Sequence, residues 1–253
     1  MGSNRIHPLP PGPWLGQYLA IGGTVKIREC TLEELLGPLN DVERKNAPKR
    51  LFVSGDISTL QRGARVSIVG TRKPSVEGTE QARRLAAALA SAGVVVVSGL
   101  AEGVDTAAHE GALGAGGATV AVLGTPLDKA YPAKNRALQD RISHDYLTVS
   151  QFPTGTPTLP MNFPMRNRTM ALISDATIIV EAGEKSGTLH QGWEALRLGR
   201  PLFILDLIMK NQALPWPKEM IRYGAQPLST EDWNPIMEFL PERSGAAFAA
   251  PSF

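Results

Sequence analysis

The chain has 253 residues, of which 43% are hydrophobic and 20% are charged, proportions found in ordinary soluble globular proteins. Aliphatic runs such as Val94–Val97 are far shorter than the roughly 20 residues of a membrane-spanning helix, and the first residues lack the apolar core of a signal peptide. A single cysteine, Cys30, excludes an internal disulfide framework and a cysteine-cluster zinc site. We therefore expect a cytoplasmic protein with one large α/β domain and without a metal or cofactor.

The net charge is only +2, from 26 basic and 24 acidic residues, so the overall charge does not indicate a nucleic-acid-binding protein. A local cluster of basic residues can nevertheless bind phosphate on a near-neutral protein. The positions of the arginines therefore matter more than their number.

The two ends of the chain have weak secondary-structure signals. Residues 1–47 show no strong hydrophobic period, and a run of prolines near the start predicts an extended or loosely packed segment. The sequence Thr31-Leu-Glu-Glu34 has the spacing of a capping box, which predicts one short helix running to about Leu39. The predicted organisation is an N-terminal extension at 1–47, a domain at 48–240 and a flexible tail at 241–253.

The central segment alternates between short strand patterns and helical patterns. The strand patterns are rich in Val and Ile, and such near-continuous apolar runs are typical of strands buried on both faces of a parallel sheet. Predicted strands cover 66–70, 94–99, 119–124, 146–152, 176–182 and 201–205, and predicted helices cover 78–91, 104–113, 134–142, 165–174 and 188–198. This alternation predicts an α/β fold, namely a Rossmann-like doubly wound, mostly parallel sheet with helices on both faces.

Three loops at the predicted carboxyl ends of strands are rich in Gly, Ser, Thr and basic residues. They are Gly70–Ser75, Ser98–Gly103 and Gly183–Thr188. Ligands gather at this edge of a doubly wound sheet, where glycine lets an anion approach and exposed amides at a helix start donate to it. Each loop alone is equally well explained as a tight turn. Arg72, Lys73 and Lys185 would add positive charge at the same edge.

The stretch Phe163-Pro-Met-Arg-Asn-Arg168 begins a predicted helix with two arginines. A pair of helix arginines is usually a solvated face. Here the pair precedes a buried strand at the same predicted edge as Arg72 and Lys185, and four basic groups at one edge favour binding of a phosphate chain. Bases would need stacking platforms, for which Phe152, Phe163 and Trp193 are candidates.

Two common nucleotide motifs are missing. The dinucleotide fingerprint is absent after Gly70, which is followed by Thr-Arg-Lys-Pro. The loop Gly183–Thr188 lacks the Gly-Lys-Ser/Thr ending of a Walker A sequence. The sequence therefore does not favour NAD or ATP chemistry.

Several motifs follow one another in a fixed order along the central segment. They are Pro48–Asp56, Ser67-Ile-Val-Gly-Thr-Arg72, Ser98-Gly-Leu-Ala-Glu-Gly-Val-Asp-Thr-Ala-Ala-His109, Val122-Leu-Gly-Thr-Pro-Leu-Asp128 with Tyr131-Pro132, Phe163-Pro-Met-Arg-Asn-Arg168, and Glu181-Ala182 with Lys185-Ser-Gly187. In this order they resemble the motifs of the DNA-processing protein A family, also called DprA or Smf. The resemblance runs from about residue 48 to residue 240.

The resemblance implies a protein without catalytic residues that binds single-stranded DNA with no marked sequence preference. It also implies a homodimer that helps to load a RecA-type recombinase during natural transformation. Arg72, Arg166 and Arg168 would contact the strand. The predicted nucleic-acid-binding and phosphate-binding residues are Gly70, Arg72, Lys73, Ser98, Gly99, Lys134, Arg166, Arg168, Lys185, Ser186, Gly187 and Thr188. Asp105 and His109 are expected to tie their loop to its helix by hydrogen bonds rather than to act as an acid and a base.

The chain departs from the family pattern in its length and in one loop. From its length we expect it to lack the N-terminal helical domain and the C-terminal winged-helix domain of many members, and Ser186–Gln191 contains the bulkier His190 and Gln191. The loop resembles in part that of LOG-type enzymes, which cleave nucleoside monophosphates, but Gln191 stands where their glutamate assists catalysis, and an amide cannot take up a proton. Nucleotide sensing without turnover and LOG-type hydrolysis remain alternatives to DNA binding.

Overall fold

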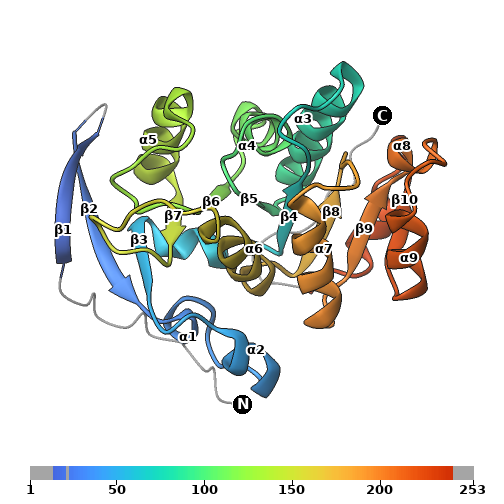
Figure 1. The fold of residues 1–253 in the computed structure, drawn as a ribbon. Coiled ribbons are helices and arrows are strands. Elements are labelled where there is room, and N and C mark those ends of the chain that lie inside the picture. The colour runs from blue at the N-terminus through green and yellow to red at the C-terminus, as the bar shows by residue number, and fades with distance from the viewer. Residues whose placement is uncertain (1–13, 21–22, 242–253) are drawn as a thin grey trace, which may run out of the picture.

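A computed structural model describes residues 14–20 and 23–241 (Figure 1). Within these residues ten strands form one sheet in the order β1-β2-β3-β7-β6-β5-β4-β8-β9-β10. The strands from β7 to β10 in that order are parallel, whereas β1, β2 and β3 join the β7 edge as antiparallel strands. The strands are β1 (Trp14–Ala20), β2 (Gly23–Cys30), β3 (Leu51–Gly55), β4 (Arg65–Val69), β5 (Val95–Ser98), β6 (Thr119–Leu123), β7 (Leu147–Ser150), β8 (Ala176–Ile179), β9 (Leu202–Leu205) and β10 (Gln226–Leu228).

Helices cover both faces of the sheet. Figure 1 shows α3, α4 and α5 on one side and α6 and α7 on the other. The α-helices are α1 (Leu32–Leu36), α2 (Asp41–Asn46), α3 (Val76–Ser91), α4 (Val104–Gly114), α5 (Arg136–Asp145), α6 (Asn162–Ile173), α7 (Thr188–Arg197), α8 (Asp206–Met209), α9 (Trp216–Arg222) and α10 (Asn234–Met237), with short 3-10 helices at Ile57–Gln61 and Ala133–Asn135. The prediction of a mostly parallel α/β sheet covered on both faces is confirmed.

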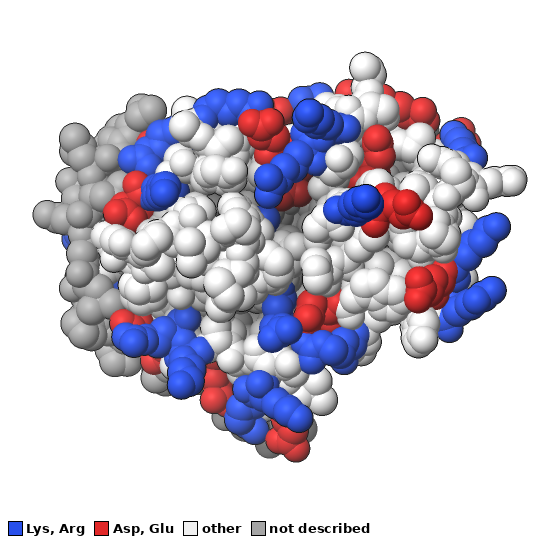
Figure 2. All heavy atoms as spheres, in the orientation of Figure 1, with Lys and Arg blue, Asp and Glu red and all other residues white. Residues whose placement is uncertain are grey.

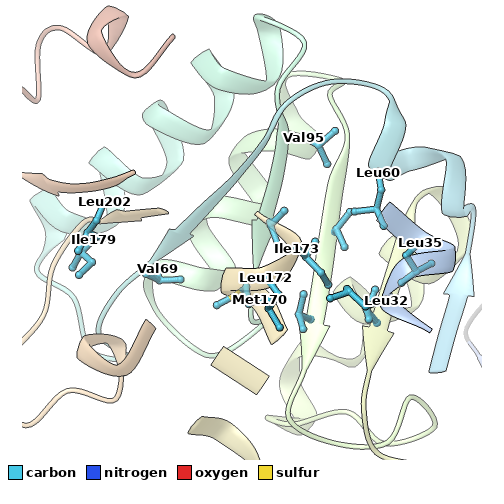
Figure 3. Close-up of a cluster of buried hydrophobic side chains, with 14 of the residues drawn as sticks. Leu32, Leu35, Leu60, Val69, Val95, Met170, Leu172, Ile173, Ile179 and Leu202 are labelled. Atoms are coloured by element: carbon cyan, nitrogen blue, oxygen red, sulfur yellow. The ribbon is translucent and has the colours of Figure 1, made fainter. Parts of the chain in front are cut away.

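Successive side chains of each central strand point to opposite faces of the sheet, and since they are mostly apolar, both faces of the sheet are apolar. Val95 and Val97 belong to the cluster on the side of α6, while Val94 and Val96 belong to the cluster on the side of α3 and α4. Figure 3 shows the first of these clusters, in which side chains of α6 and α1 converge on the sheet. Each fully buried leucine there contributes about 1.5–3 kcal/mol to stability.

The segment before β3 differs from the prediction. The capping box is present, because the Thr31 and Glu34 side chains bond each other's backbone N–H groups, but α1 ends at Leu36 rather than near Leu39. A second helix, α2, follows with its own capping box, and two strands precede α1. The prediction of one short helix in residues 1–47 is therefore wrong. The prolines of the start and the residues after 241 lie outside the described residues.

A buried ion-pair network closes the amino ends of the parallel strands. Arg65, at the start of β4, lies 2.8 Å from Asp175 just before β8, and each side chain is only 5% exposed. Arg200 approaches the same carboxylate at 3.9 Å and also pairs with Glu43 of α2. The network thus connects α2 to the sheet at the edge opposite the glycine-rich loops 70–75, 98–103 and 183–188. Nowhere in the described part of the chain is a helix long and apolar enough to cross a membrane.

Candidate nucleic-acid interface

The loop after β4, residues 70–75, forms a ridge at the carboxyl edge of the sheet, which we call the β4 ridge. Its neighbours hold it by hydrogen bonds. Thr71 N–H donates to the Glu181 carbonyl at 2.7 Å, and the backbone N–H and hydroxyl of Ser75 donate to the Glu181 carboxylate at 3.0 and 2.8 Å. On the other side, Val104 N–H donates to the Thr71 carbonyl at 3.3 Å. The ridge is therefore a fixed part of the sheet edge.

A pocket of about 500 Å³ lies between the β4 ridge, α6 and the start of α7. Its lining includes eight predicted site residues, namely Gly70, Arg72, Lys73, Arg166, Lys185, Ser186, Gly187 and Thr188. Arg72, Lys73 and Lys185 are exposed, so their cationic groups face solvent at the mouth of the pocket. The structure thus brings together the basic residues of two loops that lie more than a hundred residues apart in the chain.

Arg166 differs from the exposed cations because it is buried, with 5% of its surface exposed. Its guanidinium donates to the carbonyls of Gly99 and Val122 and to the Asn167 side chain. Burial lowers the pKa of Arg166, while the adjacent Asp105 carboxylate acts in the opposite direction. Arg166 lines the pocket, yet most of its donors already bind protein oxygens.

Ser98 and Gly99 do not line the first pocket and offer no free donors to it; they support the residues beneath it. Ser98 is fully buried, and its hydroxyl donates to the Ile68 carbonyl at 2.7 Å. A Cβ atom on Gly99 would lie 1.8 Å from Arg166 Nη1 and 2.7 Å from Asp105 Oδ2. Gly99 is therefore required for the close approach of the Arg166 guanidinium to the backbone of β5.

The loop into α7 closes the other wall. The Thr188 hydroxyl donates to the Gly70 carbonyl at 2.8 Å, which joins this loop to the β4 ridge. Asn167 of α6 donates to the Gly187 carbonyl at 3.1 Å. No atom lies within 4 Å of an added Cβ at Gly183 or at Gly187, so these glycines leave open space beside the pocket.

Two of the predicted cations lie outside this pocket. Arg168 points along α6 to Glu194 of α7, with a 3.2 Å ion pair, and Lys134 pairs with Glu102 at 3.1 Å. Neither cation lines the 500 Å³ pocket. The carboxylates that hold them could not be assigned from sequence spacing.

A second pocket, of about 540 Å³, adjoins the first on the side of β6. Arg72, Lys73, Phe163 and Arg166 line both pockets. The Arg72 guanidinium lies 5.2 Å from the centroid of the Phe163 ring, and the Tyr131 ring lies 5.4 Å from Phe163. Phe163 was predicted as a stacking platform and Tyr131 was not, although the Tyr-Pro motif marked the position of Tyr131.

The other aromatic candidates do not offer a free ring face at these pockets. Phe152 is only 7% exposed, and Trp193 packs edge-on against Tyr223 with ring centroids 5.4 Å apart. Neither residue lines the two pockets. Among the three predicted platforms, Phe163 alone stands beside the basic residues.

The titratable groups behind the pocket are fixed inside the protein. His109 is fully buried, its Nδ1 lies 2.7 Å from the Thr119 hydroxyl, and burial lowers its pKa to about 3. Burial raises the pKa of Asp105, which accepts a bond from Ala101 N–H. Gln191 is fully buried, with its amide facing the Asn167 carbonyl and the Ala171 N–H. Within the described residues no group of His, Cys, Asp and Glu side chains is arranged to hold a metal ion.

Charge is dispersed on the face of the molecule that Figure 2 draws. Figure 2 shows Lys and Arg side chains spread over one whole face of the molecule, with Asp and Glu between them, rather than gathered in one large basic patch. This agrees with the net charge of +2. Positive charge at the two pockets is therefore a local feature of the β4 ridge and the α7 loop.

Comparison with known proteins identifies relatives over most of the chain. The family model described as DNA recombination-mediator protein A matches residues 34–241. DNA processing protein DprA of Bacillus subtilis is 35% identical over 198 residues, 78% of this chain and 66% of that protein. DprA of Streptococcus pneumoniae is 40% identical over 194 residues, 77% of this chain and 68% of that protein. The chain thus spans about two thirds of the length of these relatives.

A solved structure shares the fold. DNA processing protein A of Helicobacter pylori, described for its unique single-stranded DNA binding mode, aligns with a TM-score of 0.72 and 29% identity. The alignment covers 84% of this chain and 97% of that one. The sheet, its helices and its carboxyl edge are therefore common to the two proteins.

Proposed function

The chain belongs to the DNA recombination-mediator protein A family, and from this premise we propose that it binds single-stranded DNA at the carboxyl edge of its sheet. The observation that carries the proposal is the position of Arg72. Its exposed guanidinium lies over the ring of Phe163 at the junction of two pockets. A cation and an aromatic ring side by side suit one nucleotide, whose phosphate needs charge and whose base needs a ring face.

The two pockets suit different parts of a nucleotide. The first offers Lys185 and Lys73 beside the open backbone of Gly187, which suits a phosphate group. The second offers Tyr131 and Phe163, which suit a base. None of these groups reads a base edge in a specific pattern, so we expect little sequence preference.

We propose binding without catalysis. LOG-type hydrolysis would require an acid or base where this chain has Gln191, and that amide is buried against α6. His109 and Asp105 lie beneath the pocket with hydrogen-bond partners of their own. These observations favour DNA binding over the hydrolase.

The wider role follows from the family. We propose that the protein is cytoplasmic, forms homodimers and assists a RecA-type recombinase on single strands, as in natural transformation. The support is the family's description as a recombination mediator. Light scattering of the purified chain tests the dimer, and a recombinase-filament assay on coated single strands tests the loading step.

The binding site is tested with a labelled oligothymidylate across a salt series, with duplex DNA and a nucleoside monophosphate as comparators. We expect affinity to fall with salt with a log–log slope of about 0.7 per neutralised phosphate. Arg72→Glu should weaken binding strongly and reduce that slope. Lys45→Glu, on α2 beside the opposite edge, makes the same change of charge and should have little effect. Equal losses in the two variants would refute a site at the β4 ridge, and binding of the monophosphate alone would favour a nucleotide sensor.

A further inference from the structure

A third cavity lies on the far side of the β4 ridge, between the ridge and the loop that carries α8. It measures about 400 Å³, within the range of roughly 300–1,000 Å³ that small-molecule sites occupy. The first pocket lies between the β4 ridge, α6 and α7, the second lies on the side of β6, and this cavity lies toward β9. Its lining comprises Thr71, Lys73, Ser75, Glu181, Ala182, Gly183, Leu207, Ile208, Asn211 and Leu214.

The three cavities form a continuous row along the sheet edge. Lys73 lines all three, and Thr71 and Gly183 line both the first and the third. Neighbouring strands of a sheet lie about 4.8 Å apart, so the four steps from β6 to β9 span about 19 Å. A ligand with several repeating units can therefore lie across the strands and occupy more than one cavity.

The lining of the third cavity suits a base better than a phosphate. Leu207, Ile208 and Leu214 contribute apolar surface, and Asn211 contributes an amide. Glu181 also lines the cavity, and a carboxylate at this wall would repel a phosphate. That carboxylate is held by Ser75, so the repulsion cannot be relieved by a simple rotation of the side chain.

Lys73 stands where two neighbouring nucleotides would be joined. It is exposed on the β4 ridge between the cavities, and its ammonium group is compact and flexible. A phosphate that crosses the ridge would find this cation on the way from the first pocket to the third cavity. The ridge itself stays in place because Glu181 and Val104 bond it from both sides.

We infer that the third cavity is a second base subsite, which receives the base of a nucleotide whose phosphate crosses the β4 ridge at Lys73. The inference rests on the proposed single-strand binding and adds the direction in which the strand continues, from Phe163 across the ridge toward α8. One strand would thus be bound through bases on both sides of the ridge, with phosphates over Arg72 and Lys73.

An abasic scan tests the subsite. The shortest oligothymidylate with full affinity is prepared with one abasic residue at each successive position. Base stacking on protein contributes about 1–3 kcal/mol, so loss of a bound base should weaken affinity roughly 5- to 150-fold. We expect the affinity of the wild type to fall when the base is missing at either of two positions of the oligonucleotide. These positions should lie on the two sides of the phosphate that crosses the ridge.

Asn211→Glu supplies the matching variant. Asn211 is exposed, and its side-chain oxygen accepts the Ala213 N–H at 3.1 Å, a bond that Glu can replace. In this variant the added charge should prevent a base from binding in the third cavity. The abasic residue at one of the two positions should then no longer weaken binding, while the abasic residue at the other position should still weaken it. Gln212→Glu makes the same change one residue away, outside the third cavity, and should keep both positions.

The outcomes separate this inference from the proposed function. A single sensitive position in the wild type, or two that persist in Asn211→Glu, would overturn the second subsite while single-strand binding at Arg72 stands. A wild type that binds no oligothymidylate would overturn the proposed function itself.

Discussion

The close contact between Gly99 and Arg166 makes Gly99→Ala a demanding test of the pocket floor. An added Cβ would lie 1.8 Å from Arg166 Nη1 and 2.4 Å from Arg166 Cζ, both far inside contact distance. The guanidinium is buried under α6 and bonds two main-chain carbonyls, so it cannot swing into solvent without losing those bonds. The methyl group should therefore displace Arg166 from Asp105.

The expected loss of stability comes from the buried groups that lose their partners when the Arg166 guanidinium moves. Asp105 is 5% exposed, and Arg166 is the charge that favours its ionised form. Displacing the guanidinium also breaks its bonds to the Gly99 and Val122 carbonyls, and each buried polar group left unpaired typically costs about 1–3 kcal/mol, more if it is charged. Because domains are stable by only about 5–15 kcal/mol, Gly99→Ala should lose a large part of its stability.

Urea unfolding of Gly99→Ala measures this loss, with Gly187→Ala as the matched control. Gly187 lines the first pocket together with Arg166, and an added Cβ there meets no other atom of the described residues within 4 Å. The control should stay within about 0.5 kcal/mol of the wild type. If Gly99→Ala also stays within about 1 kcal/mol, Arg166 is not held as described and the reasoning on the pocket floor fails.

Two further predictions concern His109 and Arg168. The folded pKa of His109 is about 3 against an ordinary 6.5, so the unfolded chain takes up the extra proton and stability should fall by about 1.4 kcal/mol per pH unit as pH drops below about 6.5. The difference in urea midpoints between wild type and His109→Asn, followed from pH 7 to pH 5, isolates this contribution; parallel curves would contradict it. Arg168 is paired with Glu194 outside the pocket, so Arg168→Ala should weaken single-strand affinity less than about twofold. A loss as large as that of Arg72→Ala in the same binding assay would show that Arg168 leaves Glu194 to reach the strand.

The central strands could be predicted from the sequence because each is a short run of apolar residues. Runs such as Val94–Val97, which are buried on both faces of the sheet, predict a core strand of a parallel sheet. The same pattern fails at the edges of the sheet. β10 has three residues and contains Pro227, and β2 carries only the weak alternation of Val25 and Ile27 among polar residues.

The candidate site was predictable to the extent that it depends on topology. Loops at the carboxyl ends of parallel strands must share one edge, which is why Arg72 and Lys185 meet although they are far apart in sequence. Side-chain direction does not follow from that rule. Arg166 points inward to main-chain carbonyls, and Arg168, two positions on, faces Glu194 on the surface. The spacing gave no means of deciding which arginine would be buried.

The contacts of β2 and α2 with the rest of the sheet limit where the chain can be shortened or joined to another domain. β2 pairs with β3, and Glu43 of α2 pairs with Arg200. A recombinant fragment beginning at residue 48 would expose the backbone N–H and C=O groups of one side of β3, and an open strand edge recruits other chains into aggregates. It would also deprive Arg200 of a carboxylate. Because β1 covers the other side of β2 in the same way, protein engineers who want the DNA-binding edge alone should keep residues 14–47 and attach tags or partner domains before them.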